Sequence, residues 1–131
     1  MAKLTEAMKA LMAGQLSYVA TSMPDGRPSI GVKGSLKVID DEHVAFFEMM
    51  GGRTWQNIQK NPNVAIAVAD RGKVAGYRFE GKVVEHITSG PLYDEAKKLS
   101  EMMKIPMPPK AAVKVKIEEI YDLGKGGFKV D

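Results

Sequence analysis

Residues 17–39 read SYVATSMPDGRPSIGVKGSLKVI, and this stretch predicts the fold class. Its first six residues, 17–22, are rich in β-formers and predict a strand. The segment from Pro24 to Pro28 predicts a hairpin turn, because its Asp-Gly pair supplies positions with positive φ. A partner strand is expected from Ser29 to Ile39, and glycines within it predict a bulge, a barrel corner or a close backbone approach. The stretch therefore predicts an antiparallel hairpin.

Outward from this hairpin, apolar patterns predict more short strands and a few helices. The last strand alternates apolar and charged residues, which indicates one buried and one solvated face. Residues 124–131 are expected to be loose, or ordered only by a partner. The pattern predicts a mainly β protein with short helices, whose antiparallel strands form a closed or nearly closed barrel. One domain is expected over residues 1–131. The expected strands are 43–48, 64–69, 77–85 and 111–121, and the expected helices are 4–14, 54–60 and 91–103.

Composition narrows the function classes only partly. Among 131 residues, 19 Lys and Arg face 16 Asp and Glu, a net charge of +3 that suits an anionic small ligand and also a weak nucleic-acid binder. The lack of cysteine excludes disulfides and thiolate chemistry, and His43 and His86 lack metal-ligand spacing, so no metal site is expected. A polar N-terminus and the absence of a long apolar run favour a cytoplasmic protein without membrane contact.

The stretch with chemical content is GGRTWQN, residues 51–57. Two glycines lead into a predicted helix, whose first N–H groups lack partners and carry partial positive charge. Arg53 adds donors suited to phosphate oxygens, and the Thr54 hydroxyl can cap the helix or donate to the same anion. Asn57, one turn on, projects near the same end. The stretch predicts a phosphate seat.

Other interpretations of this stretch stay open. Helix starts of this type are common, so a capped helix with an exposed arginine explains the same residues. The glycine spacing is not that of a Walker motif. Trp55, the only tryptophan, is either a core or interface anchor or a residue that stacks on a ligand.

The ordered set of motifs resembles the FMN-binding split barrel, the superfamily of pyridoxamine 5′-phosphate oxidase and small bacterial FMN-binding proteins. No single motif is diagnostic, and the resemblance covers roughly residues 4–86. The matching text is YVAT at 18–21, DGRP at 25–28, GSLKV at 34–38, RTWQNI at 53–58 and NPNVA at 61–65.

The resemblance implies how FMN would be held. The basic and hydroxyl residues that open the short helix would bind the phosphate, with Arg53 where the family usually has lysine. The ring would lie along two strands. Lys33 would stabilise the negative charge of the reduced ring, whereas Glu48 would oppose it unless that carboxylate points outward. The expected cofactor residues are Val32, Lys33, Gly34, Ser35, Phe47, Glu48, Met49, Arg53, Thr54 and Asn57.

The resemblance also implies a homodimer whose cofactor sites lie at the subunit interface. Residues of the second chain should then complete each site, and Tyr77, Trp55 and the C-terminal segment are the candidates.

Two functions from different classes follow. The first is an FMN-dependent oxidoreductase or electron carrier with a nicotinamide or other small-molecule donor, in which no general acid or base stands out; a deazaflavin is an alternative cofactor. Pyridoxamine 5′-phosphate oxidase activity itself is not favoured, because residues 126–131 lack the C-terminal Arg/His constellation of those enzymes. The second is a non-catalytic barrel that binds nucleic acid or another anion. Aromatic residues make up 7% and form no paired stacking platform, which argues against nucleic acid.

Overall fold

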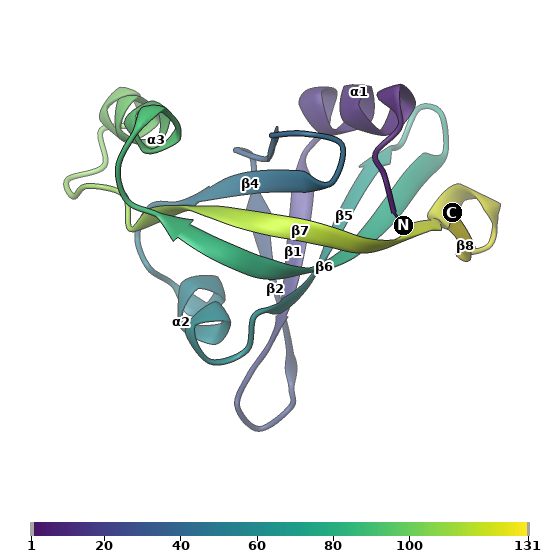
Figure 1. Ribbon diagram of the computed structural model, residues 1–131, viewed down its shortest axis with the longest axis horizontal. Helices are drawn as coiled ribbons and strands as arrows, with labels where there is room; N and C mark the ends of the chain where they lie inside the picture. The colour runs from purple at the N-terminus through teal and green to yellow at the C-terminus, as the bar shows by residue number, and fades with distance from the viewer. Residues whose placement is uncertain (1, 131) are drawn as a thin grey trace.

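The computed structural model describes residues 2–130, which form one long antiparallel sheet with three α-helices around it (Figure 1). The prediction of a mainly β protein with short helices is confirmed. The elements are α1 (Glu6–Gly14), β1 (Ser17–Ser22), β2 (Pro28–Lys33), β3 (Lys37–Val38), β4 (His43–Glu48), α2 (Arg53–Lys60), β5 (Asn63–Asp70), β6 (Ala75–Ile87), α3 (Pro91–Met102), β7 (Ala111–Asp122), the 3₁₀ turn η1 (Leu123–Lys125) and β8 (Phe128–Val130).

The strand order explains why the sheet curls. It runs β2-β1-β5-β6-β7-β4-β3, with β8 added to β7, and every pairing is antiparallel. The strands β2 and β3 lie at opposite ends of this order, yet only residues 34–36 separate them in the chain. The two edges must therefore come close, and the sheet forms a barrel that is split where these edges fail to pair.

This break corrects one expectation. A single strand was expected from Ser29 to Ile39, but the chain turns at Gly34 and Ser35 and leaves the first hairpin. The glycine therefore marks a barrel corner, one of the outcomes that its place in the strand predicted.

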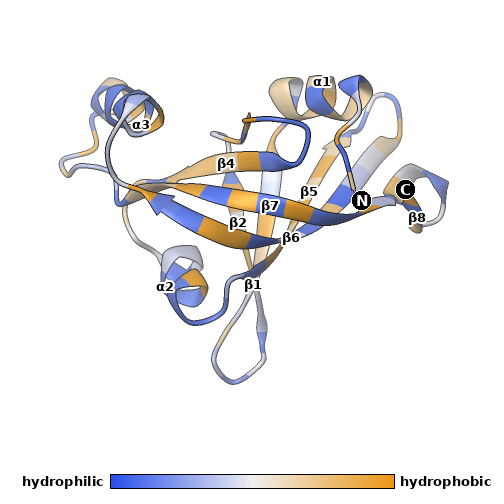
Figure 2. Ribbon diagram, in the orientation of Figure 1, coloured by the Kyte–Doolittle hydropathy of each residue, from blue (hydrophilic) through white to orange (hydrophobic). Residues whose placement is uncertain are grey.

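Hydrophobic and hydrophilic residues alternate along β7 (Figure 2), and the buried hydrophobic residues of the long strands form the main core. Phe46, Ile66 and Phe79 are fully buried at its centre. The helix α1 is capped by Thr5, whose hydroxyl accepts from the Met8 N–H at 3.3 Å, and the apolar side of the helix packs onto the same core.

The C-terminal residues are ordered, so the expectation that 124–131 would be loose is wrong for residues 124–130; Asp131 lies outside the described residues. The side chain of Asp122 accepts a hydrogen bond from the Gly124 N–H at 3.0 Å and starts the 3₁₀ turn. The chain then reverses at Gly126 and Gly127, both at positive φ, and β8 pairs with the end of β7. Backbone pairing within the chain supplies this order.

Gly81 gives a test of the barrel. It lies at a register shift between β6 and β7, where an added Cβ would meet the Lys116 carbonyl oxygen at 2.1 Å. We expect Gly81→Ala to lower the free energy of unfolding by about 1–3 kcal/mol or more, because backbone must move to relieve the overlap.

Urea unfolding followed by circular dichroism measures this difference. The control is Gly14→Ala, since nothing lies within 4 Å of a Cβ built there at the end of α1. Equal stability of both variants would contradict the close approach at Gly81.

Candidate functional site

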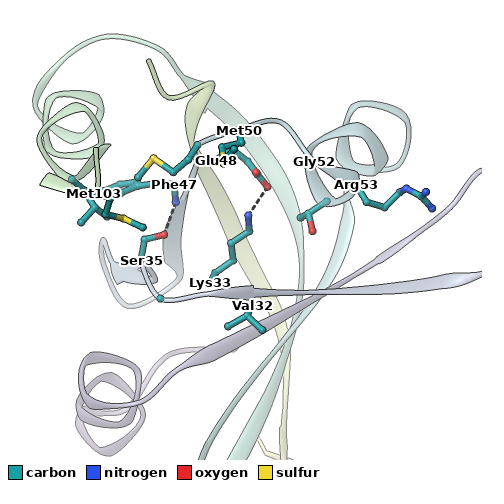
Figure 3. Close-up of a pocket in the computed structure, with 13 residues that line it drawn as sticks. Val32, Lys33, Ser35, Phe47, Glu48, Met50, Gly52, Arg53 and Met103 are labelled. Atoms are coloured by element: carbon teal, nitrogen blue, oxygen red, sulfur yellow. Dashed lines mark hydrogen bonds and ion pairs between the residues drawn. The ribbon is translucent and has the colours of Figure 1, made fainter. Parts of the chain in front are cut away.

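A cavity of about 430 Å³ opens at the split of the barrel (Figure 3). Its floor comes from the end of β2 and the following turn, one wall from the end of β4, and another from the start of α2. The helix α3 covers part of it. The lining residues are Val32, Lys33, Gly34, Ser35, Phe47, Glu48, Met49, Met50, Gly52, Arg53, Thr54, Leu99 and Met103.

The structure brings together nine of the ten residues that the sequence suggested as cofactor-binding, with Asn57 outside the lining. Their role in holding a cofactor stays a prediction. Sequence reasoning did not assign Leu99 and Met103 to the site. Leu99 lies on the apolar side of α3 and Met103 is the C-cap of this helix; an apolar helix face does not reveal whether it covers a core or a cavity.

The helix α2 presents its N-terminus to the cavity. Its N-cap is Gly52, which has no side chain to satisfy the first N–H groups, so these donors stay available. Thr54 is buried behind them and packs close to β2. A Cβ on Gly31 would lie 2.6 Å from the Thr54 hydroxyl oxygen, so glycine there lets the helix start approach the strand. The arrangement provides backbone and hydroxyl donors at one end of the cavity.

Arg53 lines this end, but its guanidinium points away from Lys33 (Figure 3). One guanidinium nitrogen lies 3.0 Å from the sulfur of Met23. This contact is weak and exposed, so the side chain can turn toward an anion at the helix start.

Asn57 is directed into the fold. Its side-chain amide donates to the Thr21 hydroxyl at 3.0 Å, and both side chains are buried. This bond ties α2 to β1, which gives Asn57 a structural role. Its predicted contact with phosphate stays a prediction.

An ion pair lies within the cavity, between the start of α2 and the side chains of Ser35 and Met103 (Figure 3). The Lys33 ammonium on β2 lies 3.0 Å from a carboxylate oxygen of Glu48 on β4 (Figure 3). Glu48 is only 2% exposed. The sequence suggested that this carboxylate would disfavour a reduced ring unless it pointed outward. In the structure the carboxylate points inward and is paired with Lys33.

Next to this pair, Ser35 connects the two edges of the split. The Phe47 N–H donates to the Ser35 hydroxyl oxygen at 3.0 Å. The β3 strand pairs with β4 only at Val44 and Ala45, so the serine replaces a strand partner farther along. The side chain thus satisfies a backbone group that the split leaves without a strand.

The side chains expected to complete a second subunit's site lie outside the cavity of their own chain. The Trp55 ring packs 5.0 Å from the His86 ring, and the Tyr77 ring 6.0 Å from Phe79. Both rings also pack against the main core. Their contribution to a partner's site stays a prediction.

The resolved pKa shifts at Asp40 and Tyr121 belong to surface residues away from the cavity. The backbone N–H of Glu42, with a smaller effect of His43, lowers the pKa of Asp40. The hydrogen bond from Tyr121 to the carboxylate of Glu119 raises the pKa of that phenol. Asp40 lies in a turn and Tyr121 on the surface of β7, so neither pKa shift concerns a residue of the cavity.

A split antiparallel barrel with one cavity, lined by a helix N-terminus and by a lysine, defines the class of the protein. Comparison with known proteins agrees: the family described as pyridoxamine 5′-phosphate oxidase matches residues 4–124. The chain belongs to this family. Within residues 2–130, no helix is long and apolar enough to cross a membrane.

Relatives share the sequence over nearly the whole chain. HupZ from Group A Streptococcus is 36% identical, with 98% of this chain and 99% of that chain covered and a TM-score of 0.82. An uncharacterized protein of Methanocaldococcus jannaschii is 32% identical over 95% of this chain and 83% of its own length. An FMN-binding protein of Syntrophomonas wolfei, 19% identical over 82% of this chain and 76% of that chain, shares the fold with a TM-score of 0.70. The split-barrel prediction is therefore confirmed.

The role of Asn57 can be measured directly. We expect Asn57→Ala to lower the free energy of unfolding by about 1–3 kcal/mol, because it leaves the buried Thr21 hydroxyl without its partner. The neighbouring exposed Gln56→Ala should change stability by less than about 0.5 kcal/mol. Chemical denaturation of both variants tests this, and equal effects would show that the buried bond contributes nothing.

Proposed function

We propose that the chain is an FMN-binding flavoprotein that acts as an oxidoreductase or electron carrier. The observation that carries this proposal is the single cavity that joins the open N-terminus of α2 to the charged side chains of Lys33 and Glu48. A volume of about 430 Å³ lies within the range of small-molecule sites. The fold shared with the FMN-binding protein of Syntrophomonas wolfei adds support.

The phosphate would bind at the start of α2. Free backbone N–H groups, the positive end of the helix dipole and the Thr54 hydroxyl all favour a dianion there. Arg53 adds a charged donor once its exposed side chain turns inward. The glycines at 51 and 52 allow the ligand to approach the backbone, and Gly51 has a φ of +75° that glycine adopts without strain.

The ring would lie between the end of β2 and the end of β4. Phe47, Met49 and Met103 offer apolar surface for a planar ring, and the polar groups of Lys33 and Glu48 line the same cavity. This combination of apolar walls and a few polar groups is typical of cofactor sites.

FMN would supply the hydride or electron transfer, while the protein orients the ring and restricts water. No general acid or base is assigned, since electron or hydride transfer does not require one from the chain. A nicotinamide or another small molecule would donate the electrons. A deazaflavin is the alternative cofactor, and a cytoplasmic location stays an expectation from the sequence.

We also propose that the chain forms a homodimer through the outer face of β1 and β2. Tyr18 and Val32 are paired across these strands, and Ile30, which is 70% exposed, lies two residues away on the same face. The Val32 side chain points to the opposite side of β2 from Lys33 (Figure 3). The apolar face therefore backs directly onto the cavity, and a second copy placed there would lie beside the cofactor.

The cofactor proposal predicts a yellow protein that releases FMN on denaturation. We expect Arg53→Ala to weaken FMN binding about tenfold or more, because a charged hydrogen bond contributes about 1.5–3 kcal/mol. Riboflavin, which lacks phosphate, should bind about equally to both proteins.

Titration followed by flavin fluorescence measures these constants. Arg71→Ala, in the turn between β5 and β6, is the control for loss of one surface charge. Unchanged FMN affinity in Arg53→Ala would contradict the placement of the phosphate.

The dimer proposal predicts that Ile30→Glu yields a monomer, since a charge would be buried in an apolar interface. Analytical ultracentrifugation at micromolar concentrations measures the mass. Val74→Glu, at an apolar position that is 81% exposed in the turn between β5 and β6, should keep the mass of the parent protein. A dimeric Ile30→Glu variant would exclude this face.

A further inference from the structure

The pair formed by Lys33 and Glu48 is the most enclosed charged group in the cavity. The Lys33 side chain is 16% exposed and that of Glu48 is 3% exposed. The ammonium also lies 5.6 Å from the centre of the Phe46 ring, on the side of the barrel core. Surface pairs such as Lys37 with Glu95 are much more open to solvent, at 46% and 48%. Water therefore screens the cavity pair less than it screens the surface pair.

The contact between Lys33 and Glu48 is mainly electrostatic and has little hydrogen-bond character. The closer oxygen of Glu48, Oε2, is buried and has no hydrogen-bond donor with acceptable geometry, although the Lys33 nitrogen is 3.0 Å away. A carboxylate in this state is costly unless a cation lies beside it. Each charge thus depends on the other, and the pair as a whole is neutral.

We propose that Glu48 sets the balance between oxidised and reduced FMN by cancelling the charge of Lys33. This inference rests on the proposed function. Glu48 is a positioning residue in this scheme. It holds the ammonium at the cavity wall and removes most of the field that a lone lysine would exert on the ring.

The electric field of an ion pair decays faster with distance than that of a single charge. A flavin gains negative charge when it is reduced, and a lone cation at its edge would favour the reduced form. A carboxylate 3.0 Å from that cation turns the single charge into a dipole, whose effect falls off more steeply with distance. The neutral pair keeps a polar contact for the ring without strongly favouring reduction. The pairing explains how a lysine and a glutamate can line one flavin cavity.

The test is the midpoint potential of bound FMN in Glu48→Gln, together with the dissociation constant of oxidised FMN. Glutamine keeps the shape and removes the charge. We expect oxidised FMN to bind within about threefold of the parent protein, and the reduced form to be favoured about tenfold more. That ratio corresponds to a rise of about 30 mV for a two-electron couple.

Two more variants complete a double-mutant cycle of Lys33 and Glu48. Lys33→Met leaves an uncompensated carboxylate and should shift the potential downward. The double variant, without either charge, should return close to the parent value, because removing both partners of a buried pair is often neutral. Should Glu48→Gln fail to fold, the difference between Lys33→Met and the double variant supplies the same comparison.

Glu95→Gln is the matched control, since it removes the same charge from an exposed ion pair. A potential that changes equally in Glu48→Gln and Glu95→Gln, or in neither, overturns the inference. Loss of oxidised FMN binding in a folded Glu48→Gln variant also overturns it, because Glu48 would then bind the cofactor directly. Parent protein that binds no FMN overturns the proposed function itself, so the two failures are distinguishable.

Discussion

The connection from β2 to β3 is the constraint on which the rest of the structure depends. Residues 34–36 must join the two ends of a seven-strand order, and the four steps from Lys33 to Lys37 reach only about 14 Å. A flat sheet of that width would separate the same ends by about 29 Å at 4.8 Å between neighbouring strands. The sheet has to curl until its edges meet. The site follows from this curl, because the edges meet without pairing and leave a cavity between them.

Polar groups at the split show how an unpaired sheet edge is satisfied from within. At the open edge of β4, Ser35 accepts the Phe47 N–H. On the paired sides, the Ser17 hydroxyl of β1 donates to the Lys33 carbonyl at 2.5 Å, and the Lys110 N–H before β7 donates to the Glu48 carbonyl at 2.7 Å. These bonds provide partners for backbone groups that would otherwise be buried without any. The charges of Lys33 and Glu48 then face the cavity together with the donors at the start of α2, so its polar lining is not an open strand edge.

Local patterns predicted most strands and the start of α2, because alternation and glycine-rich turns are properties of short segments. The break at Gly34 could not be placed, since strand propensity continues through Leu36 and Val38 and only the closure of the barrel decides where the chain turns. The strand β8 was missed because Phe128 and Val130 lie among glycines and gain order from β7. Nine of the ten suggested site residues line one cavity because they sit at the strand and helix ends that the resemblance aligned. The α3 wall depends on packing between distant segments, which no local pattern encodes.

The α3 wall of the cavity packs on an apolar cluster of its own. The helix α3 docks through a small apolar cluster in which Phe47, Ala96 and Ala112 are buried, separate from the main barrel core. Phe47 belongs both to this cluster and to the cavity lining. The floor of the cavity is therefore fixed by the barrel, whereas its apolar cover is fixed by a few contacts of one helix. Substitutions on α3 can therefore reshape the cover at little cost to the barrel, and Phe47 is the buried side chain that the cavity lining shares with the α3 cluster.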